Sequence, residues 1–304
     1  MADLAGRVGA AVHDDVVANV QWRSPDPRAG ATLSREVAAH LAQRHELSSP
    51  IELALLALPA SIRLSRASIS GFRVPAIGIE AGSGDLILGA NLEFPGSDLT
   101  STVHAEGFVA LRVRRRGQRL ATLVVPRARP CAFCRQTLAE TAGAAGLRIV
   151  DPLGNDVSLE ELYPWAFQPD ALGAEPDTGA LAWPDLDVGV DVPPDVGASL
   201  VEAGSRAHTP YTRAPSAAAL RTRDGRITGA GCVESVAFNP TTTALQAALV
   251  EITAAGYPFE DVVEGWLART SPAPVDPAPG FRGLLAAVAP AATAHVIAWQ
   301  AGER

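Results

Sequence analysis

Two short stretches decide how this chain folds: VHAE at residues 103–106 and PCAFC at residues 130–134. Imidazole nitrogens and thiolates are good zinc ligands, so His104, Cys131 and Cys134 form a candidate ligand set. A C-x-x-C at the start of a helix can point both sulfurs at one ion, and the helix N-terminus stabilises the thiolates. We therefore expect one Zn²⁺ per chain, held between these two segments.

A carboxylate stands beside this candidate ligand set. Three protein ligands leave one position of a tetrahedral zinc ion for water, which zinc makes nucleophilic near neutral pH. Glu106, two residues after His104, is expected to lie next to that water, take its proton and relay it to the substrate. The order H-x-E and then P-C-x-x-C is the known signature of zinc-dependent deaminases.

Two other readings of the cysteines stay open at this point. A C-x-x-C alone also occurs in redox pairs, although a redox pair has no need of the HAE segment. A structural zinc site would be closed by a fourth ligand, for which His208 and Cys232 are the available candidates. Neither residue stands at a recognisable ligand spacing.

The pattern around the two stretches predicts an α/β protein. Residues 1–49 are expected to be helical, with Ser34 as a candidate N-cap. After them a helix is expected at 51–64, followed by strands at 74–79 and 85–94 that a turn at 82–85 separates. A helix near 103–114, a strand at 120–125, a helix at 131–143 and a strand at 147–151 complete the series. Strands that alternate with helices in this order indicate an α/β sandwich.

The second half of the chain is interpreted as a degraded copy of the first. The stretch GDLILGANLEF (84–94) aligns with GRITGAGCVESVAF (225–238), which places Glu93 opposite Glu234. Further along, the alignment places Gln246 and Ala248 opposite His104 and Glu106. The second copy has no C-x-x-C, so one copy is expected to carry the chemistry. The predicted segments are an N-terminal helical segment (1–49), a catalytic domain (50–170), a Pro- and Gly-rich linker (171–195) and a non-catalytic domain (196–304).

The chain resembles the larger, two-core-domain form of cytidine deaminase. The resemblance spans roughly residues 50–300 and is carried by GANLEF (89–94), VHAE (103–106), PCAFCRQ (130–136), HTPYTRAPSAAAL (208–220), DGRI (224–227) and AFNPTTTALQAAL (237–249). It implies a three-layer α/β/α cytidine-deaminase fold, duplicated as a catalytic copy and a zinc-free copy behind an N-terminal helical segment. It also implies a homodimer whose partner chain helps to close each active site.

The resemblance further implies a set of substrate-binding residues. Asn91 and Glu93 would bind the ribose hydroxyls, Phe72 would stack on the pyrimidine, and the Ala105 amide would hold the base carbonyl. Phe167 would approach the partner's site. The alternatives are a core position for Phe72, a turn position for Asn91 in which it satisfies its own backbone, and a solvated strand end for Glu93.

Two departures from the family pattern bear on the substrate. Pro75 stands where the family has glycine, so the strand is expected to lie at a sheet edge or to be reshaped. Gly107 follows the HAE, where the family often has a larger polar residue, and is expected to weaken its helix by about 1 kcal/mol relative to alanine.

The expected reaction is deamination of cytidine and 2′-deoxycytidine. The alternatives are a deaminase of a modified cytosine nucleoside and a non-catalytic zinc protein.

Composition excludes other classes of function. The net charge of −8 argues against binding to polynucleotides, which favours a basic surface. No run of apolar residues is long enough to span a bilayer, and no secretory signal pattern opens the sequence. The expectation is a cytoplasmic enzyme with a small-molecule nucleoside substrate and no membrane partner.

Overall fold

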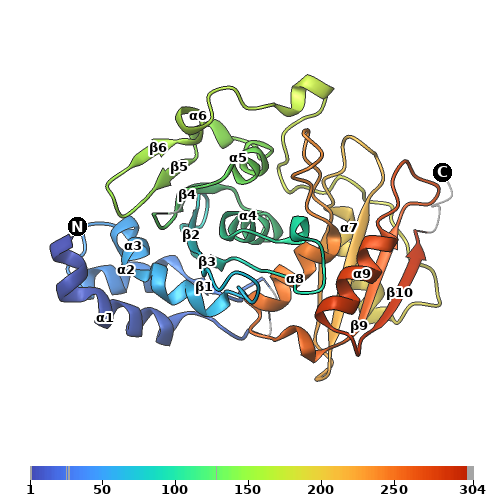
Figure 1. The fold of residues 1–304 in the computed structure, drawn as a ribbon, viewed down its shortest axis with the longest axis horizontal. Helices are drawn as coiled ribbons and strands as arrows, with labels where there is room; N and C mark the ends of the chain where they lie inside the picture. The colour runs from blue at the N-terminus through green and yellow to red at the C-terminus, as the bar shows by residue number, and fades with distance from the viewer. Residues whose placement is uncertain (1, 25, 27, 128, 300–304) are drawn as a thin grey trace. The chain divides into compact units, whose positions relative to one another are not determined.

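The computed structural model describes residues 2–24, 26, 28–127 and 129–299. The chain forms two compact units, each with its own β-sheet (Figure 1). The first unit comprises residues 1–92, 103–167 and 254–256, and the second comprises 93–102, 168–253 and 257–304. Among the described residues, no helix combines the length and hydropathy that a bilayer crossing requires. The segment boundaries expected from the sequence stay a prediction.

The first unit contains a mixed sheet of order β1-β3-β2-β4-β5-β6. Strands β4 and β5 are parallel and the other neighbours are antiparallel. Helices α1–α3 cover one face of this sheet and α4 and α5 cover the other (Figure 1). The elements in chain order are α1 (Ala2–Asn19), β1 (Thr32–Leu33), α2 (Arg35–Arg44), α3 (Pro50–Ser61), β2 (Pro75–Glu80), β3 (Leu86–Ala90), α4 (Ala105–Arg115), β4 (Leu120–Val124), α5 (Ala132–Ala139), β5 (Arg148–Val150), β6 (Asp156–Ser158) and α6 (Leu159–Leu162).

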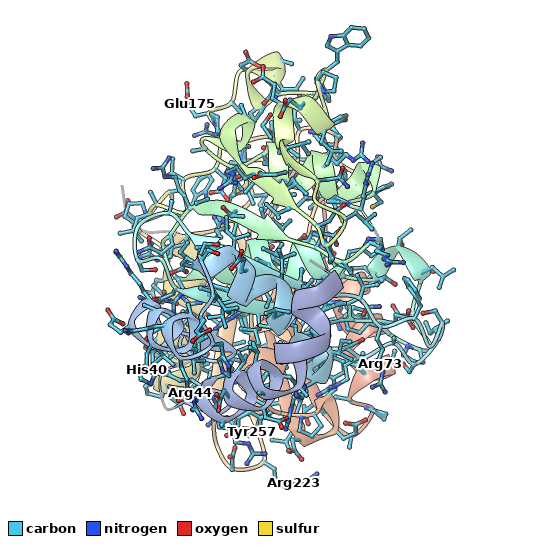
Figure 2. All side chains as sticks on the ribbon, turned by 90° about the vertical axis from the view of Figure 1, so that its left-hand side faces the viewer. His40, Arg44, Arg73, Glu175, Arg223 and Tyr257 are labelled. Carbon is cyan, nitrogen blue, oxygen red and sulfur yellow. The ribbon has the colours of Figure 1, made fainter. Side chains whose placement is uncertain are left out.

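The helix and strand order expected from the sequence is confirmed in this unit. Ser34 caps α2, because its side chain accepts a hydrogen bond from the Val37 amide. The same helix turns Leu41 into the core and carries His40 and Arg44 on its exposed face (Figure 2).

Of the two expectations for Pro75, a sheet edge or a reshaped strand, the sheet edge is wrong. Pro75 is the first residue of β2, a central strand that lies between β3 and β4. It stands opposite Ala90 of β3, and pairing with β4 begins only at Ile77. Proline is tolerated at the first position of a strand, so its missing N–H disturbs neither ladder.

Helix α4 approaches the sheet closely at two glycines. A Cβ atom on Gly78 of β2 would lie 2.4 Å from Val109 Cγ1, and one on Gly89 of β3 would lie 2.7 Å from Val109 Cγ2. A Cβ at Gly89 would also lie 2.9 Å from Phe108 Cδ1. These distances are far below van der Waals contact, so only glycine lets α4 pack at this depth. The depth of α4 fixes where its first residues lie.

The opposite end of α4 is anchored by two arginines. The guanidinium of Arg112 is fully buried and donates to the carbonyl oxygens of Arg28 and Gly30, at 2.9 and 2.6 Å. Arg116 Nε donates to Glu80 Oε1 at 2.6 Å, and its Nη2 lies 2.5 Å from Asp85 Oδ2. Burying these charges is tolerated because each is paired or hydrogen-bonded. They join α4 to the end of β2 and to the loop before β1.

The second unit repeats the core of the first. Its sheet has the order β10-β9-β7-β8, in which β7 is antiparallel to β8 and β9, and β9 is parallel to β10. The first sheet contains the same four-strand arrangement as β5-β4-β2-β3. The elements are α7 (Pro194–Ser205), β7 (Ser216–Thr222), β8 (Ile227–Gly231), α8 (Ala244–Ala254), β9 (Val262–Arg269), α9 (Ala278–Val288) and β10 (Thr293–Ala298). The predicted duplicated α/β fold is confirmed.

Small irregularities recur at equivalent places in both copies. A register shift interrupts the β2–β4 ladder between Ile79 and Glu80, and another interrupts β7–β9 between Arg221 and Thr222. After the second hairpin strand, an antiparallel bridge joins Leu92 to Val103 in the first copy and Val233 to Thr242 in the second. These bridges set the correspondence between the two copies.

The alignment of the zinc motif with the second copy needs correction. Helix α4 begins at Ala105, two residues after the bridged Val103, and α8 begins at Ala244, two residues after the bridged Thr242. Thr243 therefore corresponds to His104, and Leu245 corresponds to Glu106. Gln246 and Ala248, which the sequence alignment placed there, lie one helical turn further along.

Replacing Gly89 with alanine tests the close approach of α4. We expect Gly89→Ala to lower the free energy of unfolding by about 1–3 kcal/mol, because the added methyl overlaps Val109 and Phe108. Urea denaturation measures the change. Gly107→Ala is the control, because its Cβ would meet Val103 Cγ1 at an ordinary 3.8 Å. It should stabilise α4 by up to about 1 kcal/mol. Equal stability of Gly89→Ala and the parent protein would refute this packing argument.

Candidate metal centre and active site

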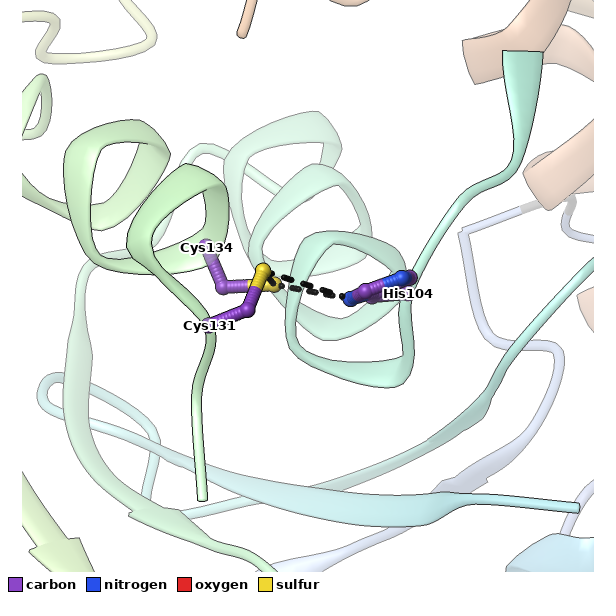
Figure 3. A group of neighbouring side chains, drawn as sticks. All are labelled: His104, Cys131 and Cys134. Carbon is purple, nitrogen blue, oxygen red and sulfur yellow. Dashed lines mark hydrogen bonds between the residues drawn. The ribbon is translucent and has the colours of Figure 1, made fainter. Parts of the chain in front are cut away.

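Three potential metal ligands converge between the first residues of α4 and α5. His104 Nδ1 lies 3.5 Å from Cys131 Sγ and 3.4 Å from Cys134 Sγ, and the two sulfurs lie 3.6 Å apart. Figure 3 shows the two thiols facing the imidazole across a narrow gap. The three side chains differ in exposure to solvent: His104 is exposed, Cys131 is half-buried and Cys134 is buried.

These distances fit a zinc ion. A tetrahedral ion with Zn–S bonds of about 2.3 Å and a Zn–N bond of about 2.0 Å separates its sulfurs by about 3.8 Å, and nitrogen from sulfur by about 3.5 Å. The observed edges match these values within a few tenths of an ångström. Among the described residues, no other three histidine, cysteine or acidic side chains lie close enough together to hold an ion. Neither His208 nor Cys232 belongs to the group. Three donors leave one tetrahedral position for a reactant.

The two helices supply their N-termini to the site. His104 is the N-cap residue of α4 and Cys131 is the N-cap residue of α5, and neither side chain caps its own helix. The hydrogen bond between the sulfurs lowers the pKa of the Cys131 thiol to about 5. The same hydrogen bond, together with burial, raises the pKa of Cys134 far above its usual range. Ligation of both sulfurs therefore requires release of the Cys134 proton.

Glu106 lies beside the three ligands without belonging to them. Its side chain is 4% exposed, and it is within hydrogen-bonding reach of the Cys134 thiol. Burial raises the pKa of this carboxyl above its ordinary value, while hydrogen bonding and the imidazole of His104 act in the opposite direction. A carboxylate whose pKa is raised is a stronger base than an exposed one, which suits it to take up a proton and return it.

Comparison with known proteins identifies the family. Two family models, both described as the cytidine and deoxycytidylate deaminase zinc-binding region, match residues 52–146 and 159–278. Together they span most of the chain, and the first contains all three ligands and Glu106. The chain belongs to the cytidine and deoxycytidylate deaminase family. It is a zinc-dependent deaminase with two domains of this superfamily and one Zn²⁺ site, which confirms the expected cofactor.

Solved structures with local similarity include other deaminases. The cytidine deaminase from Mycobacterium tuberculosis is 28% identical over 36% of this chain and 90% of its own, with a TM-score of 0.32. The cytidine deaminase from Mycobacterium leprae is also 28% identical, over 38% of this chain and 97% of its own, with a TM-score of 0.34.

The deaminase has lost the ligand set in its second copy. Thr243 occupies the N-cap position that His104 occupies in the first copy. Pro277 is the N-cap residue of α9, where α5 has Cys131, and Gly280 corresponds to Cys134. None of these side chains is a zinc ligand, so the second family match describes a copy without the metal donors.

Asn91 organises the segment that carries Phe72. Its Oδ1 accepts hydrogen bonds from Ser65 Oγ at 2.8 Å and from the Val74 amide at 2.9 Å, and its Nδ2 donates to the Phe72 carbonyl at 2.9 Å. Both acceptor positions of the amide oxygen are used and one N–H remains available. Asn91 is thus bonded to the residues before β2 rather than to its own backbone.

The other expected substrate residues differ in exposure. Phe72 is 63% exposed, which excludes the core position considered for it. Glu93 is 8% exposed, so it is not a solvated strand end. Ala105 is buried at the first position of α4, where backbone N–H groups have no partner within the helix.

Phe167 is held near α5 by contacts that the sequence did not indicate. Gln136 Nε2 donates to the Phe167 carbonyl at 2.7 Å, and Gln136 Oε1 accepts from Tyr163 Oη at 2.9 Å. The neighbouring Arg135 donates to the Leu162 carbonyl at 3.0 Å. Gln136 follows the ligand Cys134 by two residues. The turn of α5 that carries the ligand therefore also holds the segment from Leu162 to Phe167 in place. No spacing in the sequence marks Gln136 for this role.

Metal analysis tests the ligand set. The purified protein should contain one zinc per chain by elemental analysis, and Cys134→Ala or His104→Ala should reduce this to well below half. Cys232→Ala is the matched control and should retain one zinc per chain, because Cys232 is outside the ligand group. Loss of zinc in Cys232→Ala would show that the site has a ligand which the geometry does not contain.

Proposed function

We propose that this deaminase hydrolyses the 4-amino group of cytidine and 2′-deoxycytidine, giving uridine and 2′-deoxyuridine with ammonia. The observation that carries the proposal is the buried Glu106 carboxyl beside three zinc donors that match three corners of a tetrahedron. A purely structural metal site has no use for such a carboxyl.

The metal, when bound, supplies the acidity that makes a water molecule nucleophilic near neutral pH. Glu106 accepts a proton from that water as its oxygen attacks C4 of the base, and it delivers the proton to the ring nitrogen N3. The same carboxyl then takes the second proton, from the hydroxyl group that the attack has placed on C4, and gives it to the amino group. The C4–N bond breaks, ammonia leaves and C4 becomes a carbonyl. Burial of Glu106 suits this role because a raised pKa makes its carboxylate a stronger proton acceptor.

The remaining site residues bind and orient the nucleoside. The exposed Phe72 ring stacks on the pyrimidine, and the Ala105 amide at the start of α4 donates to the base carbonyl. The free N–H of Asn91 and the carboxylate of Glu93 bind the ribose hydroxyls. Such contacts reject ligands that lack the hydroxyls, because the buried polar groups would then be unpaired.

A second candidate is a deaminase of a modified cytosine nucleoside. The observation that favours it is Pro75, which begins β2 three residues after the exposed Phe72. A proline there fixes φ and reshapes the approach to the base. The chemistry would be unchanged, and the pocket around the base would differ.

We also propose that the enzyme is a homodimer that acts in cytoplasmic pyrimidine salvage. Phe167 is 42% exposed and Trp165 is 93% exposed, although both lie in the segment that α5 anchors. Aromatic side chains left on a surface are typical of a binding interface. Burial against a second copy would bring Phe167 toward the partner's site.

Replacing the proton-transfer residue tests the mechanism. Glu106→Gln should keep one zinc per chain and reduce kcat for cytidine by about a thousandfold or more, because an amide cannot shuttle the proton. Loss of cytidine absorbance and release of ammonia measure the rate. Glu160→Gln, which removes an exposed carboxylate on α6, should leave the rate unchanged. Full activity of zinc-loaded Glu106→Gln would exclude the proposed mechanism.

A substrate panel separates the two candidate functions. The proposal expects cytidine and 2′-deoxycytidine to have the highest kcat/KM among cytosine nucleosides with modified bases or sugars. Phe72→Ala should lower kcat/KM by about tenfold through lost stacking on the base. An active enzyme that ignores cytidine and accepts a modified analogue would overturn the first candidate in favour of the second.

A further inference from the structure

The second unit contains a cavity that the proposed reaction does not use. Its volume is about 340 Å³, within the range of about 300–1,000 Å³ that is typical of small-molecule sites. The residues around it come from the start of β7, from the ends of β8 and β9 and from the starts of α8 and α9. We call it the second-copy cavity.

The second-copy cavity occupies the position that corresponds to the metal centre. Its lining includes Thr243 and Pro277, the counterparts of His104 and Cys131, and Cys232 and Glu234, the counterparts of Asn91 and Glu93. The duplication has therefore kept the hollow between the two helix starts and the hairpin while replacing the residues that perform chemistry.

The charges around this cavity are already compensated. Glu234 is 6% exposed, and its carboxylate accepts hydrogen bonds from the amides of Tyr211 and Thr212 and from the Thr212 hydroxyl. Arg269, the cation in the cavity lining, lies 3.3 Å from Asp276 Oδ1. An anionic ligand such as a phosphate would find no uncompensated cation, so burying it there would be costly.

The rest of the lining is apolar or carries neutral hydroxyls. Ala214, Ala244 and Val275 give it apolar walls, and Ser216 carries a hydroxyl that can donate to or accept from a neutral ligand. The Thr270 hydroxyl donates to the Pro215 carbonyl at 3.2 Å, so it can only accept from a ligand. A cavity of this kind favours an uncharged molecule with a flat apolar face and a few polar groups at its edge.

One aromatic ring in the lining is held in a strained conformation. Phe238 has φ +59°, which is unfavourable for a bulky residue, and its side chain is 60% exposed although it borders the cavity. Its ring packs edge-on against Tyr211, at 6.1 Å between centroids. Strain of this kind concentrates at ligand-binding sites, and an exposed ring with one edge fixed is a platform on which a planar base can stack.

We propose that the second-copy cavity binds an uncharged pyrimidine nucleoside and holds it without reaction. The pyrimidine class rests on the proposed function, whereas the neutral and planar character of the ligand rests on the lining itself. The counterparts of the three metal ligands are Thr243, Pro277 and Gly280, and Leu245 stands where the first copy has Glu106, so a bound nucleoside would be neither attacked nor protonated.

The number of nucleosides bound per chain tests this proposal. Zinc-loaded Glu106→Gln protein is dialysed against radiolabelled cytidine and, separately, uridine, because this variant binds substrate without consuming it. We expect two nucleosides per chain. Adding Val275→Trp, which places an indole at the cavity wall, should leave one per chain. Adding Val190→Trp, at a residue of the same unit that is 98% exposed and outside the cavity lining, should leave two.

A second variant guards against misfolding as an explanation. Adding Phe238→Gly removes the ring at a residue whose positive φ glycine adopts without strain. It should weaken the second binding event by about tenfold, the effect of losing one stacked base, and leave the first unchanged.

Binding of only one nucleoside per chain by the Glu106→Gln variant without a cavity substitution would overturn the proposal and leave the proposed function intact. Two per chain in Val275→Trp would overturn it as well. No binding in any variant, with no turnover by the unaltered enzyme, would overturn the proposed function itself.

Discussion

The architecture depends on how closely α4 can approach β2 and β3. Gly78 and Gly89 bring the helix near enough that a single methyl group at either position would overlap Val109. The buried guanidinium group of Arg112 and the half-buried one of Arg116 hold the other end of the same helix to the sheet and to the loop before β1. The distance of α4 from the sheet and the position of its C-terminal end are therefore both fixed. As a result, α4 places His104 and Glu106 at one defined point beside α5. A ligand geometry that matches zinc within tenths of an ångström requires this rigidity.

The electrostatics of the site follow from that placement. Two helix N-termini, one imidazole and two sulfurs meet at one point, and Glu106 is buried next to them. The hydrogen bond between the sulfurs lowers the pKa of the Cys131 thiol and raises that of the Cys134 thiol, and burial raises the pKa of the Glu106 carboxyl. Cys131 is therefore ready to bind a metal as a thiolate, whereas Cys134 must first release its proton.

Much of this arrangement was predictable from sequence because the deciding residues lie close together along the chain. The H-x-E and C-x-x-C segments each lie at the start of one helix, so the spacing within each segment follows from helix formation. Short apolar runs separated by turn residues located the strands. Features that depend on tertiary contacts were missed. The anchoring of Phe167 through Gln136 joins residues that are far apart in sequence. The position of Pro75 could not be inferred because only strand pairing distinguishes a strand's first residue from a sheet edge. The alignment of Gln246 with His104 failed because the start of α8 is set by the Val233–Thr242 bridge, and similar small residues on either side gave no register.

The N-cap residues of the two copies have one further consequence. In the second copy Thr243 and Gln246 bond to each other's backbone amides at the start of α8, with distances of 2.9 and 3.3 Å, and this reciprocal cap stabilises a helix by about 1 kcal/mol. In the first copy His104 faces the sulfurs and leaves α4 uncapped. Giving up the metal ligand at this position therefore frees it for a residue that adds folding stability. The stability that the inactive half gains adds to that of the whole chain. The chain can then tolerate residues in its active half that serve catalysis but destabilise the fold.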